Sequence, residues 1–175
     1  MRGPGGAGRG PTPRLDWLQM QSPDLSPLEL AAWRGLLRVH AHLVGELDAE
    51  LRAEHRLPLT SYEVLLTLAN AEGGELRMSE IADSVLLSRS GLTRLVDRLE
   101  AEGLVERRAC PTDRRGAYAR LTPAGRERFE AARRTHLDGV RRRFLGRLSE
   151  DDLRALAAAW EAVLPGAAEP LTAAR

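Results

Sequence analysis

The sequence has no lysine and few aromatic residues. All 26 of its strongly basic residues are arginine, and aromatic residues make up only 4% of the chain. We attribute the missing lysine to codon bias and draw no function from it. With so few rings, a core has to be built from leucine, valine and alanine, and a hydrophobic content of 43% suffices for one.

Cysteine and long apolar runs are also scarce. Cys110 is the only cysteine, so no disulfide can form within the chain, as is usual in a reducing cytoplasm. Arg107 and Arg108 could activate its thiol, although an inert small residue is the simpler interpretation. No apolar run approaches the roughly 18 residues of a membrane span, and the N-terminus lacks the apolar segment of a signal peptide. We expect a soluble, cytoplasmic protein.

Motifs of catalysis and cofactor binding are missing as well. The sequence contains no nucleotide-binding glycine loop, nucleophile elbow or zinc-hydrolase motif. His40 and His42 cannot chelate from one helix face, because residues two apart diverge. His42 and Glu46 do share a face, but no nearby cysteine completes a zinc set. The sequence therefore predicts no enzyme, no cofactor and no metal site.

Charge is distributed unevenly, although the formal net charge is only +1. Residues 1–87 carry 8 arginines against 12 acidic residues, residues 88–120 carry 8 against 5, and residues 122–175 carry 10 against 8. The basic excess therefore begins near residue 88, and a local excess of arginine is typical of a nucleic-acid contact.

Two long helical stretches enclose the basic segment. A capping box at Ser26 begins the first, predicted over 26–54, and a second capping box at Thr60 begins the next. At 1.5 Å per residue the first helix is about 43 Å long, more than one small core can cover, so we expect its apolar stripe to meet a second chain. Further helices are predicted over 122–148 and 149–164, the last with an apolar face of Leu153, Leu156, Ala157, Trp160, Val163 and Leu164.

A short helix over 79–85, a turn at 86–88 and a helix over 88–101 predict a helix-turn-helix. The last helix places Leu92, Leu95, Val96 and Leu99 toward the core and Arg89, Ser90, Thr93, Arg94 and Asp97 on the opposite face. Small hydroxyl side chains allow close approach to DNA, and arginine can bind guanine in the major groove. A solvated polar face has the same composition, so the helix alone does not decide between them.

A predicted β-hairpin follows at once, with strands over 104–108 and 117–121. Its tip exposes Arg114 and Arg115, which have nothing to pack against, and a narrow minor groove attracts arginine. Asp113 is placed to orient the Arg115 guanidinium. The alternative is an aspartate that stabilises the turn beside two solvated arginines.

Residues 76–125, LRMSEIADSVLLSRSGLTRLVDRLEAEGLVERRACPTDRRGAYARLTPAG, resemble the winged helix-turn-helix core of the MarR family of bacterial transcription regulators. The recognition helix with its exit, LSRSGLTRLVDRLEAEGLVER, the P-x-D-R-R-G wing and the L-T-x-x-G start of the next helix occur in the family order. With the flanking helices the resemblance covers roughly residues 26–164. It implies a mainly α fold with a small β-hairpin wing, in which long N- and C-terminal dimerisation helices flank the winged helix-turn-helix.

The resemblance also implies function. Members are homodimers with intertwined terminal helices that bind an imperfect palindrome in or beside promoters, here expected as a repressor. In the wing, Asp113 and Arg115 match the pair that contacts the groove. The expected contacts to double-stranded DNA are Ser88, Arg89, Ser90, Thr93, Arg94, Arg98, Asp113, Arg114 and Arg115.

Many members release DNA when an aromatic or phenolic ligand binds. The candidates for such a pocket are Trp33, Leu37, His40, Tyr62 and Leu66, although ordinary core and dimer contacts would use the same residue types. A winged helix that binds protein, or serves as an architectural module, is the competing function. An apolar outer face on helix 88–101 would favour that alternative.

These observations predict five segments. Residues 1–13, rich in glycine and proline, are expected to be a disordered tail, either solvated or lying in a minor groove. The remaining segments are N-terminal dimerisation helices (14–59), a winged helix-turn-helix DNA-binding domain (60–121), C-terminal dimerisation helices (122–164) and a flexible tail (165–175).

Overall fold

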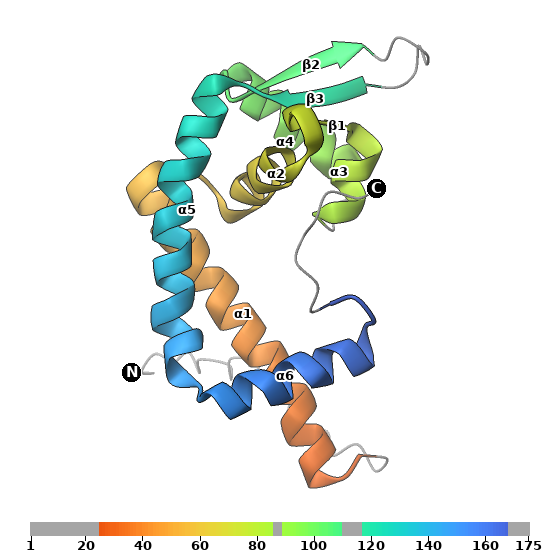
Figure 1. Cartoon of the computed structure of the whole chain (residues 1–175), viewed down its shortest axis with the longest axis vertical. Helices are drawn as coiled ribbons and strands as arrows, with labels where there is room; N and C mark the ends of the chain where they lie inside the picture. Colours follow the sequence, from red (N-terminus) through yellow and green to blue (C-terminus); the bar gives the residue numbers. More distant parts are fainter. Residues whose placement is uncertain (1–24, 86–88, 110–116, 168–175) are drawn as a thin grey trace, which may run out of the picture. The chain divides into compact units, whose positions relative to one another are not determined.

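The computed structural model describes residues 25–85, 89–109 and 117–167 (Figure 1). They fall into two compact units, one ending at Arg38 and one beginning at Val39. The helix α1 (Pro27–His55) confirms the first predicted helix. Its capping box is present, since Ser26 N–H donates to the Glu29 carboxylate at 2.7 Å and Glu29 N–H donates to Ser26 Oγ at 3.3 Å.

The fold class is confirmed as mainly α with a small antiparallel sheet. In the described parts of the chain no helix has the length and apolar character needed to cross a bilayer. The elements after α1 are α2 (Leu59–Asn70), η2 (Glu72–Gly74), β1 (Glu75–Arg77), α3 (Met78–Ser84), α4 (Arg89–Ala101), β2 (Val105–Ala109), β3 (Ala117–Leu121), α5 (Pro123–Arg143), η3 (Leu145–Arg147) and α6 (Glu150–Val163).

The sheet has three strands in the order β1-β3-β2, where the sequence predicted only a hairpin. The predicted pair, β2 with β3, runs from Val105 opposite Leu121 to Ala109 opposite Ala117. Strand β1 adds to the other edge of β3, with Leu76 opposite Ala119. Three residues are too few to give an alternating pattern, which is why this strand was missed.

The start of α2 differs from the sequence prediction. The helix begins at Leu59 and has no side-chain cap, so the capping box predicted at Thr60 is wrong. Asp48 of α1 takes over this role, because its carboxylate accepts the Leu59 N–H at 2.8 Å. Ser61, which the capping box placed at the helix start, is buried instead.

Helix α5 is shorter than predicted. It ends at Arg143 rather than near Leu148, because Phe144 leaves the helical region and the 3-10 turn η3 follows. Gly146 lies in this turn, where a Cβ would come within 2.9 Å of the Arg141 carbonyl oxygen. The two helix starts predicted nearby are confirmed, with Thr122 capping α5 and Ser149 capping α6.

One hydrophobic core joins α2, α3, α4, the sheet and α5. Fully burying a leucine side chain contributes about 1.5–3 kcal/mol, so this cluster supplies most of the stability of the region. The core residues predicted for α2, α3 and α4 are confirmed as buried: Val64, Leu65, Leu68, Ile81, Ala82, Leu92, Leu95, Val96 and Leu99.

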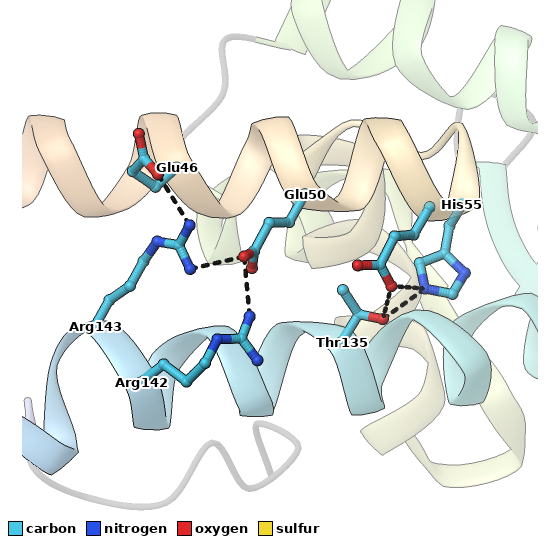
Figure 2. Close-up of polar contacts among 7 residues, drawn as sticks. Glu46, Glu50, His55, Thr135, Arg142 and Arg143 are labelled. Atoms are coloured by element: carbon cyan, nitrogen blue, oxygen red, sulfur yellow. Dashed lines mark hydrogen bonds and ion pairs between the residues drawn. The ribbon is translucent and has the colours of Figure 1, made fainter.

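Helices α1 and α5 are joined by ion pairs (Figure 2). Glu50 Oε1 accepts from Arg143 Nη1 at 2.7 Å and from Arg142 Nη2 at 2.9 Å. Arg143 also donates to Glu46 at 2.9 Å, and this hydrogen bond holds the pKa of the Glu46 carboxyl below its usual range. A Cβ on Gly139 would come within 2.7 Å of Glu50 Oε2, so a larger residue at this position would require the Glu50 side chain to shift.

Candidate nucleic-acid interface

Helix α4 presents a polar face to solvent, as the sequence predicted. Its apolar residues are buried in the core, which fixes the rotation of the helix about its axis. Ser90, Thr93, Arg94 and Arg98 are exposed on the other side. An amphipathic helix held this way leaves the guanidinium groups of Arg94 and Arg98 available to an external partner.

Arg94 and Arg98 have no counter-ion within the described structure. Neither guanidinium forms a hydrogen bond or ion pair with another described residue. Together with Thr60, Gly91 and Leu95 they line a shallow cleft of about 320 Å³ between the start of α2 and α4. Thr60, for which the sequence predicted only a capping role, is exposed beside α4 because of the packing of α2.

Most neighbouring arginines on the sheet are neutralised by acidic residues. Arg108 pairs with Glu75 at 3.3 Å, and Arg120 pairs with Glu106 at 3.7 Å. Arg107 pairs with an acidic residue of α4 itself, Asp97, at 2.6 Å. The free positive charge of this region, among the described side chains, is therefore concentrated on α4 rather than spread over the sheet.

Four of the predicted DNA contacts lie outside the described residues. This applies to Ser88 and to Asp113, Arg114 and Arg115, and also to Cys110; Arg89 begins α4, but its side chain is not described. What the structure fixes is the base of the wing, where Ala109 of β2 pairs with Ala117 of β3. The roles of these side chains remain predictions.

The exit of α4 is joined directly to the start of α5. Gly103, in the left-handed region with φ 71°, ends the α4 segment, and its carbonyl accepts the Thr122 hydroxyl at 2.7 Å. Thr122 N–H donates to the Leu104 carbonyl at 3.1 Å, and Thr122 Oγ1 accepts the Gly125 N–H at 2.9 Å. The L-T-x-x-G motif therefore fixes the direction in which α5 leaves the sheet (Figure 1).

The predicted ligand residues have different environments. Trp33 and Leu37 are 54% and 47% exposed on α1, and His40 is exposed as well. Tyr62 is only 2% exposed, and burial raises its pKa to about 12. Leu66 is half-buried against the core.

Two aromatic neighbours of Tyr62 were not anticipated. Its ring centroid lies 5.6 Å from that of Phe129 and 4.6 Å from that of His136, and burial lowers the pKa of His136. Both rings come from α5, far along the chain, so no local pattern could have pointed to them. This stacking favours core packing for Tyr62.

Comparison with known proteins identifies the family. A model of the MarR family matches residues 57–116. The crystal structure of AbsC, a MarR family transcriptional regulator from Streptomyces coelicolor, aligns with a TM-score of 0.75 and 35% identity, over 79% of this chain and 93% of AbsC. The chain belongs to the MarR family of transcriptional regulators.

Other MarR-family proteins show how far the similarity extends. Sco3205 from Streptomyces coelicolor, solved in complex with DNA, aligns with a TM-score of 0.78 and 32% identity, over 87% of this chain and 94% of Sco3205. The transcriptional repressor MprA of Escherichia coli (strain K12) is 37% identical over 99 residues, 57% of this chain and 56% of MprA. The chain spans about half the length of the curated relatives it matches.

Proposed function

We propose that this MarR-family protein binds double-stranded promoter DNA as a homodimer and represses transcription. The observation that carries the proposal is the pair of arginines on the exposed face of α4, Arg94 and Arg98, without a counter-ion in the described structure. Arginine at such a position can bind guanine O6 and N7 or a phosphate. The DNA complex of Sco3205 and the repressor role named for MprA support the proposal by similarity.

The homodimer is supported by the distribution of exposed apolar side chains. In the described residues every exposed large hydrophobic side chain lies in α1, just before it, in η3, or at the C-terminal end of α6. Several large apolar side chains exposed on one helix are typical of an interaction surface. These side chains are Leu25, Leu28, Trp33, Leu36, Leu37, Val39, Val44, Leu145, Trp160, Val163 and Leu164.

We expect a stable dimer in solution before DNA is added, because these side chains need a partner. Light scattering at micromolar concentration measures the mass of the particle, and Trp160→Glu is expected to shift that mass toward the monomer.

Two α4 helices related by a two-fold axis should contact half-sites separated by about one helical turn, roughly 10–10.5 base pairs between centres. A footprint over a single unrepeated half-site, or a stable wild-type monomer, contradicts the symmetric proposal.

The competing function, a winged helix that docks on protein, predicts apolar residues on the outer face of α4. The exposed residues there are Ser90, Thr93, Arg94, Asp97 and Arg98, and the absence of apolar residues among them favours DNA over a protein partner. Selecting bound fragments from the source genome with purified protein distinguishes the two functions, because only the regulator enriches a common palindrome.

We also propose that an aromatic or phenolic ligand lowers the affinity for DNA by favouring another spacing of the two α4 helices, a coupling between two sites. Exposed Trp33 and Leu37 support this part of the proposal. Aromatic acids are expected to weaken the gel shift of the wild type. Trp33→Ala should remove the response without changing DNA binding in the absence of ligand, and an unchanged response in this variant excludes Trp33 from the pocket.

A further inference from the structure

Arg107 joins the wing strand β2 to the recognition helix α4. Its Nη1 lies 2.6 Å from Asp97 Oδ1, and its Nη2 donates to the Thr93 carbonyl oxygen at 3.1 Å. The Arg107 backbone N–H donates to Glu100 Oε1 at 3.1 Å. Arg107, at the root of the wing, therefore contacts three residues of α4, Thr93, Asp97 and Glu100, which span about two turns of the helix.

The pleat of β2 explains why Arg107 forms polar side-chain contacts with α4, whereas its neighbours Glu106 and Arg108 do not in the described structure. Successive side chains of a strand point to opposite faces, so Glu106 and Arg108 lie on the other face of the sheet. There Glu106 pairs with Arg120, and Arg108 pairs with Glu75. The Arg107 side chain is 29% exposed against 55% for Arg108, because it packs onto α4.

Asp97 would be unfavourable on a DNA-binding face without this contact. It lies one turn from Thr93 and Arg94, and 53% of its side chain is exposed. A solvated carboxylate there repels phosphate, so its removal should tighten binding. The ion pair with Arg107 indicates instead that the Asp97 carboxylate links α4 to strand β2.

We propose that Arg107 is a positioning residue, with Asp97 as its anchor, and that the pair sets the angle between α4 and the wing without either residue contacting DNA. The inference rests on the proposed DNA binding. Two elements that engage one duplex together must be held at a fixed separation, and a loose wing loses affinity through the entropy of ordering it. The fork of arginine suits this role, since it binds a carboxylate and a carbonyl at once.

Affinity for a selected duplex operator, measured over a series of salt concentrations, tests the proposal. Asp97→Asn and Arg107→Gln should each weaken binding roughly tenfold, and the double variant should be no weaker than either alone. The slope of log affinity against log salt should equal that of the wild type, because no phosphate contact is lost. Arg107→Lys restores the charge but not both hydrogen bonds and should recover part of the affinity.

Arg120→Gln is the matched control, because it removes the same charge from the sheet without touching α4, and it should bind like the wild type. The thermal unfolding of each variant shows that the fold is intact. Asp97→Asn that binds as tightly as the wild type or more tightly overturns the inference. So does a salt slope reduced by about two in the Arg107→Gln dimer, which indicates a direct phosphate contact.

The outcomes separate this inference from the proposed function. Wild-type protein that binds no promoter duplex overturns both. If the wild type binds and Arg94→Ala weakens it while the Asp97 and Arg107 variants do not, the DNA-binding proposal stands and the positioning role is wrong.

Discussion

Replacing Arg94 and Arg98 together by alanine is expected to remove specific DNA binding at physiological salt. Arg94→Ala alone should cost about 1–3 kcal/mol on the preferred site and relax the preference at one base position, as expected for a base-reading arginine. Arg98→Ala should instead weaken binding to all sequences. Because a dimer carries the residue twice, the salt slope should fall by about two.

The size of the effect follows from counterion release. A protein that neutralises six to ten phosphates loses about 10³–10⁵ in affinity between 50 and 200 mM salt, so few arginines decide whether binding survives. Fluorescence anisotropy over a salt series measures both the affinity for the operator and its dependence on salt concentration. Arg134→Ala is the control, since Arg134 is exposed on α5 and has no ion pair in the described structure. Equal slopes for the Arg98 variant and this control contradict the proposed contact.

Gly125→Ala is expected to destabilise the fold by about 1–3 kcal/mol or more, because it overpacks a site closed by backbone. A Cβ at this position would overlap the Leu104 carbonyl oxygen and lie 2.8 Å from Leu121 Cδ1. Backbone cannot rotate away as a flexible side chain can, so α5 has to move relative to the exit of α4. Urea unfolding at fixed protein concentration measures the loss.

Gly45→Ala is the matched control for that measurement. Gly45 lies inside α1, and apart from its chain neighbours and the adjacent backbone of the helix, no atom of the described chain comes within 4 Å of an added Cβ. Alanine in a helix interior is more favourable than glycine by roughly 0.5–1 kcal/mol, so this variant should unfold at a higher urea concentration. A Gly125 variant as stable as the wild type contradicts the close packing of α5 against Leu104.

Most helices, and the buried faces of α2, α3 and α4, were predictable from the sequence. The long apolar stripe of α1, the core face of α4 and the caps at Ser26, Thr122 and Ser149 depend on residues three or four positions apart. Such spacings are read directly from the chain, because the helical period places these residues on one face. The family resemblance rests on the same local order of recognition helix, wing and following helix.

Predictions from local spacing were wrong or incomplete where the deciding hydrogen bond comes from a residue distant in the sequence. The capping box at Thr60 was wrong because Asp48, from another helix, caps α2. Strand β1 escaped notice because three residues become a strand only when β3 pairs with them. In both cases the hydrogen bond that decides the structure joins parts of the chain that no short sequence window contains.

The sequence by itself determined that basic residues cluster from residue 88 onward and that α4 turns a polar face to solvent. Only the tertiary structure decided which arginines are free to bind DNA. Arg107, Arg108 and Arg120 look as available in the sequence as Arg94 does, yet each has an acidic partner on a neighbouring element. Charges pair through space over a few ångströms, and that distance is set by the pleat of the sheet and the packing of α4, not by position along the chain.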